Sequence, residues 1–118
     1  MASQKHHGGC HCGAVEYTVE LDLEADALVC NCSICRRTGA MMMFVAPDKF
    51  ELAKGDDAVK DYTFNKGNIH HLFCTTCGVR SFGRGQGQNG PMVMVNARCL
   101  DDVNVFAQKT KQYDGASR

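Results

Sequence analysis

The sequence predicts a small, mainly β domain, and three observations support this prediction. Several segments alternate apolar and polar residues with a period of two, which is typical of half-buried strands. No segment shows a sustained helical period. Seven of the eight cysteines fall into three tight groups, as in small domains held together by metal ions. With 118 residues, we expect a single zinc-binding domain over residues 1–118 with a modest core that metal crosslinks would stabilise.

The first half of the chain is expected to form a flexible lead followed by short strands. Residues 1–8 are polar, and we expect them to be loosely held, with their two histidines solvated. Alternation over 15–21 predicts a half-buried strand, and the apolar run 27–29 predicts another. The methionine-rich run 41–45 indicates a buried strand, in which thioethers fill the core rather than bind copper. A further short strand is expected at 50–52.

The second half is expected to form a hairpin, a loop and a final core strand. Residues 59–64 and 69–73 have strand composition, and the turn-forming residues 65–68 between them predict a β-hairpin. The segment 83–91 holds four glycines, and we expect it to be a mobile surface loop. Residues 92–95 form an apolar run that predicts a core strand. Beyond this strand we expect turns, one short pairing near residue 105 and a polar tail.

Charge and hydropathy indicate a cytoplasmic protein. The chain has 13 Lys plus Arg and 13 Asp plus Glu, and this balance argues against a nucleic-acid partner. No run of 18 apolar residues exists, so no membrane association is expected. The polar N-terminal residues lack the apolar region of a signal peptide. In the reducing cytoplasm, clustered cysteines favour metal thiolates over disulfides.

The cysteine groups suggest one closed and one open zinc site. Zinc binds thiolates in tetrahedral geometry; four thiolates close a site, and three leave a position for water or substrate. Loop closure allows the group at 74–77 to join either the first group or part of the middle one. A glycine follows both Cys12 and Cys77, as in zinc knuckles, and this favours joining the first and last groups. The favoured division is a four-cysteine group of Cys10, Cys12, Cys74 and Cys77, and a three-cysteine group of Cys30, Cys32 and Cys35.

Other candidate ligands are less favoured. An iron–sulfur protein is an alternative, but such clusters commonly need four cysteines each and would have to recruit Cys99. Cys99 stands alone beside a strand end, where a small buried residue is the expected role. His11 is expected to point away from its flanking cysteines, and His70 and His71 lie on opposite faces of a strand. We therefore expect no histidine ligand.

A three-thiolate zinc site predicts thiol chemistry. A thiol that enters the vacant position would be deprotonated, and the thiolate could then attack an electrophile such as an aldehyde. Three thiolates carry more negative charge than the ion carries positive charge, so the ion is a weak Lewis acid and hydrolysis is less favoured. The same charge excess makes the site labile, so that it can be partly empty.

Four segments carry a resemblance to a known family. They are residues 9–15 (GCHCGAV), 30–36 (CNCSICR), 73–78 (FCTTCG) and 95–101 (VNARCLD). On these motifs the chain resembles the glutathione-dependent formaldehyde-activating enzyme family, which includes centromere protein V. The resemblance implies several small, coiled antiparallel sheets, as in zinc-bearing Rab guanine-nucleotide release factors. It also implies structural zinc at the four-cysteine group and a second zinc at the three-cysteine group.

The family resemblance implies a carbon–sulfur lyase reaction. Glutathione would add to formaldehyde to give S-(hydroxymethyl)glutathione, so that a small thiol and a small aldehyde are the expected partners. The sequence identifies no catalytic residue beyond the open site itself. The alternative is a non-catalytic zinc module that binds a protein partner or a small thiol, because the chain is short and no general base is evident beyond exposed histidines.

Overall fold

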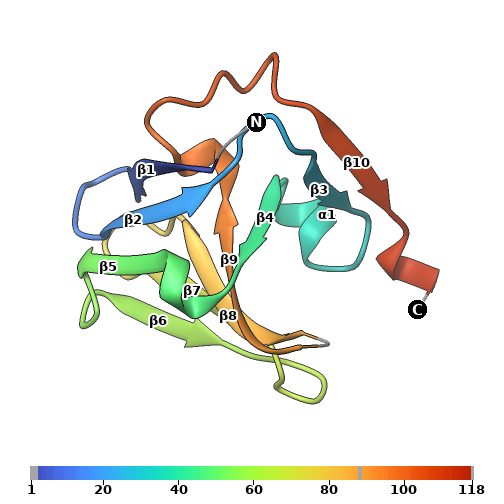
Figure 1. Cartoon of the computed structure of the whole chain (residues 1–118). Helices are drawn as coiled ribbons and strands as arrows, with labels where there is room; N and C mark the ends of the chain where they lie inside the picture. The colour runs from blue at the N-terminus through green and yellow to red at the C-terminus, as the bar shows by residue number, and fades with distance from the viewer. Residues whose placement is uncertain (1–2, 88, 118) are drawn as a thin grey trace.

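The structure is a computed structural model that describes residues 3–87 and 89–117, and it contains two β-sheets (Figure 1). The smaller sheet is antiparallel and has the order β1-β2-β5, formed by Gln4–Gly9, Glu16–Leu21 and Phe50–Lys54. The larger sheet has the order β10-β3-β4-β9-β8-β7-β6. Its strands are β3 (Ala27–Cys30), β4 (Met42–Val45), β6 (Val59–Tyr62), β7 (His70–Cys74), β8 (Phe82–Gly87), β9 (Gly90–Asn96) and β10 (Thr110–Tyr113). The prediction of a mainly β domain is confirmed.

Helical structure among the described residues is limited to single turns. The α-helix α1 spans Cys35–Thr38, and three 3-10 turns span Pro47–Lys49, Ala97–Cys99 and Gly115–Ser117. None of the helices in the described part of the chain is long and apolar enough to cross a membrane.

The strands predicted from alternation are present. In β2, Tyr17, Val19 and Leu21 are buried while the residues between them are partly exposed. The predicted hairpin of β6 and β7 forms with antiparallel pairing from Val59↔Cys74 to Tyr62↔His71. In both cases local sequence and tertiary packing favour the same conformation, so the period of two in β2 and the turn-forming residues of the hairpin were sufficient signals.

The prediction of a mobile loop over 83–91 is wrong for the described residues of that range. β8 and β9 pair in antiparallel register from Phe82↔Val95 to Gly87↔Gly90; residue 88, to which the same prediction applied, lies outside the described residues. The glycines serve close packing: a Cβ atom added to Gly83 would lie 2.8 Å from the carbonyl oxygen of His70. Glycine within a strand marks such close approach of a neighbouring backbone.

The N-terminal segment also differs from the expectation. Residues 4–8 of the predicted flexible lead belong to β1, which pairs with β2, whereas residues 1 and 2 lie outside the described part. His6 is buried, and its Nδ1 atom lies 2.8 Å from a carboxylate oxygen of Asp102. His7 is exposed and lies 2.8 Å from Asp101. The acidic partners are about 95 residues away in the sequence, so local composition gave no sign of this pairing.

The C-terminal segment forms a strand where a polar tail was expected. β10 pairs in parallel with β3, from Thr110↔Ala27 to Tyr113↔Cys30, and lies at the edge of the larger sheet beside β3 (Figure 1). All four of its residues are exposed, so it carries no apolar alternation that could predict a strand. The residues near 105, where a short pairing was expected, form turns.

Strand alternation divides the interior into two cores. In β9, Val93 and Val95 pack into the core that also holds β2, while Met94 belongs to a smaller cluster with Met42. β4 divides in the same way, because Met43 belongs to the main core. The methionine run is thus core filling, as predicted, but its alternate residues serve different cores. The smaller cluster also contains Cys30 and Cys35, so it adjoins the three-cysteine group.

Candidate metal centres and the adjoining cavity

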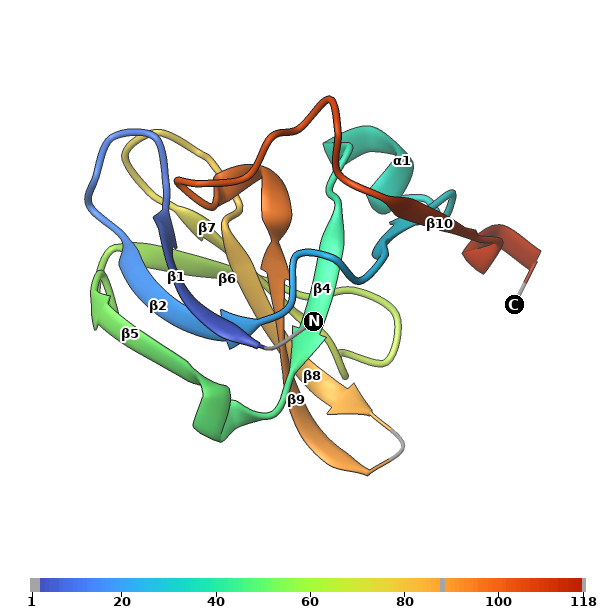
Figure 2. The same ribbon diagram turned by 45° about the horizontal axis from the view of Figure 1, so that its top comes forward.

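The four-cysteine group comes together at one end of the molecule. Cys10 and Cys12 lie in the β1–β2 connection, and Cys74 and Cys77 lie where β7 turns toward β8; Figure 2 shows the two connections side by side. All four sulfurs lie within 4.8 Å of one another, and Cys12 Sγ is 3.6 Å from the sulfurs of both Cys10 and Cys74. Thiolates about 2.3 Å from a tetrahedral zinc ion would lie about 3.8 Å apart, so the group fits zinc.

The backbone turns the four sulfurs toward a common point. Gly13 and Gly78, each directly after a cysteine, have φ angles of +86° and +79°, a conformation that side chains with a Cβ rarely adopt. The backbone N–H of Val15 donates to Cys10 Sγ at 3.3 Å, and that of Thr76 donates to Cys74 Sγ at 3.3 Å. Such hydrogen bonds stabilise the thiolate form, which is the form that binds metal.

The electrostatics of this group are suited to a cation. The N–H groups of Val79 and Cys12 lower the pKa of the Cys77 thiol to about 6. For Cys12 the N–H of Ala14 acts in the same direction, but burial and the neighbouring thiols Cys74 and Cys10 outweigh it and raise the pKa to about 11. The crowded sulfurs therefore cannot all ionise without a positive charge between them, and a divalent ion would supply that charge.

The three-cysteine group is built from one continuous segment. Cys30 ends β3, Cys35 begins α1, and Cys32 lies between them, with all three sulfurs within 4.8 Å of one another. The N–H of Cys32 donates to Cys30 Sγ at 3.4 Å, and α1 ends after one turn at Gly39. Burial raises the pKa of Cys35 to about 12. Burial also raises that of Cys32, but hydrogen bonds from the Cys35 and Ile34 backbones and from neighbouring thiols outweigh it, so the pKa falls below its usual range.

Arg80 places a positive charge beside the three-cysteine group. Its Nη2 lies 3.4 Å from Met94 Sδ, while its Nε and Nη1 are buried and have no hydrogen-bond partner among the described residues. Burial lowers the pKa of Arg80, and the charges of Cys35 and Cys32 raise it. Within the described part of the chain, no carboxylate forms a salt bridge with this guanidinium. Cys35 and Cys32 are the groups whose negative charge, when they are ionised, acts on this guanidinium.

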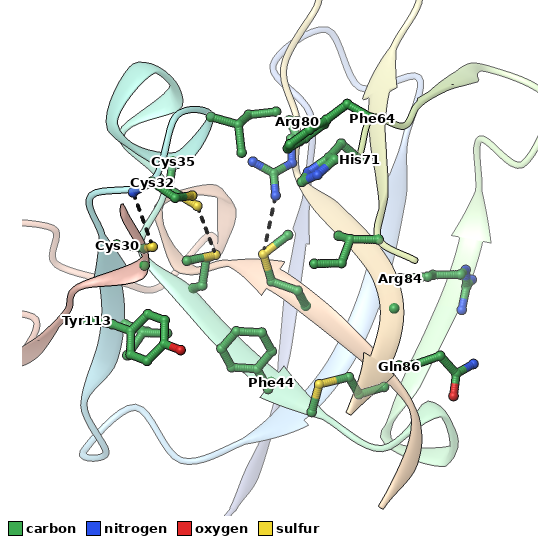
Figure 3. A pocket seen from close by; sticks show the side chains of 18 residues that line it. Cys30, Cys32, Cys35, Phe44, Phe64, His71, Arg80, Arg84, Gln86 and Tyr113 are labelled. Carbon is green, nitrogen blue, oxygen red and sulfur yellow. Dashed lines mark hydrogen bonds between the residues drawn. The ribbon is translucent and has the colours of Figure 1, made fainter. Parts of the chain in front are cut away.

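A cavity of about 310 Å³ adjoins the three-cysteine group. Figure 3 shows the cysteines on one side of this space and Arg80, His71 and Phe64 on the adjoining side. Its volume lies at the lower end of the range of small-molecule sites. His71 is stacked on Phe64, with ring centroids 5.4 Å apart, and its Nδ1 is buried without a partner among the described residues. Burial and the charge of Arg80 lower the pKa of His71 to about 4, so the imidazole is neutral at physiological pH.

The structure brings together the two sets of cysteines that the sequence favoured. Cys99 lies outside both groups and is partly buried, and burial raises its pKa to about 11. His11 is exposed and also lies outside both groups. His70 and His71 occupy opposite faces of β7, one exposed and one buried. All eight cysteines are free rather than paired in disulfides.

Sequence reasoning missed the residues that surround the open group. Arg80 and His71 carried no motif, and Gly115 lies in a tail that was expected to be unpaired. Gly115 nonetheless lies against Cys30: a Cβ atom added there would be 2.5 Å from Cys30 Sγ. The pairing of β10 with β3 and the hydrogen bonds of Asn31 to Asp114 and Ala116 bring this segment to the cysteines, and β10 has no apolar pattern.

Comparison with known proteins agrees with the fold. The family model described as "Glutathione-dependent formaldehyde-activating enzyme" matches residues 5–116. Among solved structures, the chain is similar to a crystal structure of a Rhodobacter sphaeroides protein determined in a structural genomics programme. The two share 33% sequence identity with a TM-score of 0.78, and the match covers 91% of this chain and 99% of that chain.

Proposed function

The chain belongs to the glutathione-dependent formaldehyde-activating enzyme family, and from this premise we propose that it is a zinc-dependent enzyme that joins a thiol to an aldehyde. The family is described as activating formaldehyde in a glutathione-dependent way, so family membership supports glutathione and formaldehyde as substrates of the family as a whole. The reaction proposed for this chain is formation of a carbon–sulfur bond, with Cys30, Cys32 and Cys35 as the ligands of the reactive zinc.

One observation carries this proposal. The three-cysteine group borders the 310 Å³ cavity, whereas no member of the four-cysteine group lines it. A three-thiolate zinc site keeps a coordination position open, and here that position would have a space beside it in which a substrate can bind. We therefore assign the structural role to the four-cysteine group, Cys10, Cys12, Cys74 and Cys77, and the reactive role to the three-cysteine group.

The proposed reaction is balanced without any other reactant. A bound zinc ion lowers the pKa of a thiol that joins its ligands, and the thiolate is the nucleophilic form. The thiol sulfur forms a bond to the carbonyl carbon, the C=O π bond breaks, and the proton lost by the thiol ends on the carbonyl oxygen. The product is a hemithioacetal, which for glutathione and formaldehyde is S-(hydroxymethyl)glutathione.

Arg80 is the residue of this chain best placed to stabilise charge in that reaction. Three thiolates and one zinc ion carry a net charge of −1, and the Arg80 guanidinium balances it. The developing negative charge on the carbonyl oxygen would lie in the same partly buried site, where a nearby cation is worth more than in water. His71, with a pKa of about 4, is too weak a base to be assigned proton transfer at neutral pH.

Two measurements test the function: the zinc content per chain and the rate of thiol–aldehyde exchange measured by NMR. Reduced, freshly purified protein is expected to hold two zinc ions per chain, and glutathione, as the thiol substrate, should bind at the reactive site and leave the four-cysteine group unchanged. Because the uncatalysed addition is easy, catalysis is measured as faster exchange between isotopically labelled formaldehyde and its glutathione adduct in NMR.

Matched cysteine variants complete the test. Cys35→Ser should lose the second zinc ion and the acceleration of exchange while remaining folded by circular dichroism. Cys99→Ser removes a cysteine outside both groups and should change neither. Undiminished exchange in folded Cys35→Ser protein would falsify the proposed function.

A second candidate function is a non-catalytic zinc module that binds a small thiol or a protein partner. It is favoured by one observation: the histidine that lines the cavity is neutral and weakly basic, so it gives no help with proton transfer at neutral pH. This function predicts that glutathione still displaces or binds the second zinc ion, but that the exchange rate with labelled formaldehyde equals the rate without protein.

A further inference from the structure

The cavity beside the three-cysteine group is larger and more apolar than formaldehyde requires. Formaldehyde has two heavy atoms, whereas the cavity measures about 310 Å³. Aliphatic, aromatic and thioether side chains form most of its wall, among them Ile34, Met42, Phe44, Phe64 and Met92. Burial of an apolar group against such a wall is favourable, and each fully buried methylene increases affinity by about fourfold.

The charges that border the cavity are unsuited to a zwitterion. Among the described residues, the charged side chains that line it, other than the cysteines, are Arg80 and Arg84, and none is an Asp or Glu. Glutathione carries an ammonium group as well as two carboxylates at neutral pH. An ammonium group inside this cavity would find no carboxylate partner, which is costly for a buried charge. The glutathione part of an adduct is therefore expected to lie outside the apolar part of the cavity.

The mouth of the cavity is apolar as well. Four of the cavity-lining residues are large, apolar or aromatic and substantially exposed: Phe44 (45%), Phe64 (39%), Ile69 (52%) and Tyr113 (40%). Figure 3 places Phe44 and Tyr113 on the side of the cavity opposite Phe64. Exposed apolar surface gathered around a concave site with reactive groups in it is typical of a ligand site.

We propose that this cavity accepts an apolar group carried by the aldehyde, so that the preferred substrates are adducts of thiols with aliphatic or aromatic aldehydes larger than formaldehyde. This inference rests on the proposed function, because it specifies the group attached to the carbon atom of the same carbon–sulfur bond. The apolar group occupies the space between Phe44, Met92 and Phe64, while the thiol sulfur faces the three-cysteine group.

Binding of two unreactive adduct analogues tests the inference without any turnover. S-hexylglutathione mimics the adduct of a six-carbon aldehyde, and S-methylglutathione mimics that of formaldehyde. Isothermal titration calorimetry of the zinc-loaded protein should show at least about tenfold tighter binding of the hexyl compound, because part of the hexyl group is buried in the cavity. Equal affinity for the two compounds would overturn the inference.

Methionine methyl signals locate the bound chain. Three methionines of the described residues, Met42, Met92 and Met94, line the cavity, whereas Met41 and Met43 do not. S-hexylglutathione should shift the methyl NMR signals of the three cavity methionines more than those of Met41 and Met43. Larger shifts at the latter two would mean that the chain binds elsewhere.

A pair of exposed phenylalanines provides the matched variants. Phe44→Ser removes part of the cavity wall at a position that is 45% exposed, and it should remove most of the preference for the hexyl compound. Phe106→Ser changes a side chain that is 98% exposed and does not line the cavity, and it should keep the preference intact. If Phe44→Ser retains the full preference, the apolar wall is not the specificity determinant.

The outcomes separate this inference from the proposed function. Tight binding of the hexyl compound with no acceleration of any thiol–aldehyde exchange supports the apolar site and contradicts catalysis. Accelerated exchange of formaldehyde with equal affinity for the two analogues supports catalysis and contradicts the apolar site.

Discussion

At the scale of single residues, the partly buried cation Arg80 is the feature that most distinguishes the open site. Its guanidinium has two buried N–H donors without described partners and no carboxylate in salt-bridge contact. Burial of charged atoms without a counter-ion is unfavourable, and a negative charge beside them offsets that cost. The thiolates of Cys32 and Cys35 provide that charge.

Arg80→Gln should therefore weaken zinc binding at the three-cysteine group. Loss of a group that supports metal ligands typically reduces metal affinity by about 10- to 100-fold. Competition with a chromophoric chelator measures the affinity, and the four-cysteine group in the same molecule serves as the internal reference.

Two further variants separate charge from packing in that experiment. Arg80→Lys keeps the charge and should recover part of the lost affinity, whereas a merely structural role would leave it as weak as Arg80→Gln. Lys60→Gln removes one positive charge from an exposed position on β6 and should leave both sites unchanged. Equal zinc affinity in Arg80→Gln and the unmodified protein would show that the guanidinium does not support the site.

His71 predicts a dependence of stability on pH. Burial lowers its pKa from an ordinary 6.5 to about 4, so between these values the unfolded chain binds a proton that the folded chain does not. The free energy of unfolding should therefore fall as the pH falls from about 6.5 to 4, with His71 contributing at most about 3 kcal/mol. Denaturant unfolding of the protein and of His71→Phe across this range measures the contribution.

Comparison of the unmodified protein with the His71→Phe variant isolates the contribution of this histidine to the pH dependence. Acid also protonates the cysteine thiolates and releases metal, but this loss is common to both proteins and cancels in the difference. The difference in unfolding free energy should change with pH below about 6.5 and stay constant above it. A constant difference over the whole range would mean that His71 is protonated equally in the folded and unfolded chains.

At the scale of elements, the C-terminal strand completes the open site. β10 pairs in parallel with β3 and thereby places Gly115 against the sulfur of Cys30. Asn31 strengthens the junction, because its Nδ2 donates to Asp114 at 3.0 Å and its Oδ1 accepts from the N–H of Ala116 at 3.0 Å. An edge strand with no apolar residue pattern is thus fixed by side-chain and backbone hydrogen bonds to the cysteine segment.

Gly115→Ala should disturb the three-cysteine group selectively. The added methyl group would lie 2.5 Å from Cys30 Sγ, a separation at which one of the two segments must move. We expect the zinc content to fall from two toward one per chain, with the four-cysteine group still filled. Ala116→Ser adds one atom to the exposed neighbouring residue and should leave the zinc content at two. Full zinc content in Gly115→Ala protein would show that the C-terminal segment can move away from Cys30 without disturbing the three-cysteine group.

At the scale of the whole molecule, the two cysteine groups differ in what they connect. The four-cysteine group joins the β1–β2 connection of the smaller sheet to the β7–β8 connection of the larger one. Its ligands come from segments 62 residues apart, so a metal there closes a long loop. The three-cysteine group lies within six residues and constrains only one local segment.

Stability should therefore depend on the four-cysteine group far more than on the three-cysteine group. Cys12→Ser should lower the Tm by more than about 10 °C, whereas Cys32→Ser should lower it by less than about 5 °C, because a structural metal contributes folding free energy directly. Differential scanning calorimetry with and without a strong chelator makes the measurement. Similar Tm losses in the two variants would contradict the division into structural and reactive sites.

Part of the fold and of the candidate site could be predicted from the sequence because the signal was local. The alternation of Tyr17, Val19 and Leu21 specifies a strand and also the face that it buries. The cysteines sit at spacings that a single turn can close, with glycines at positions 13 and 78 where the backbone needs a positive φ. In each case, residues close together in the chain are sufficient to define the geometry.

The features that the sequence did not reveal depend on distant partners. Glycines in β8 lower its strand propensity, yet at Gly83 the close approach of the β7 backbone leaves no room for a Cβ atom. All four residues of β10 are exposed, and the strand forms where β3 offers it an edge. His6 is buried only because Asp102 lies beside it. No local pattern encodes a contact between segments about a hundred residues apart.

By itself, the sequence determined the β class, the three cysteine groups and the family, because strand periodicity and motif spacing are properties of short segments; it favoured the division of the cysteines into four and three, which the packing of the sulfurs then showed. Only the tertiary structure decided that the three-cysteine group borders a cavity, that this cavity is apolar, and that Arg80 supplies its charge. These properties arise where β3, β4, β7, β9 and the C-terminal segment meet. A cavity is a relation among side chains from separate strands, and its shape and charge exist only once those strands have packed together.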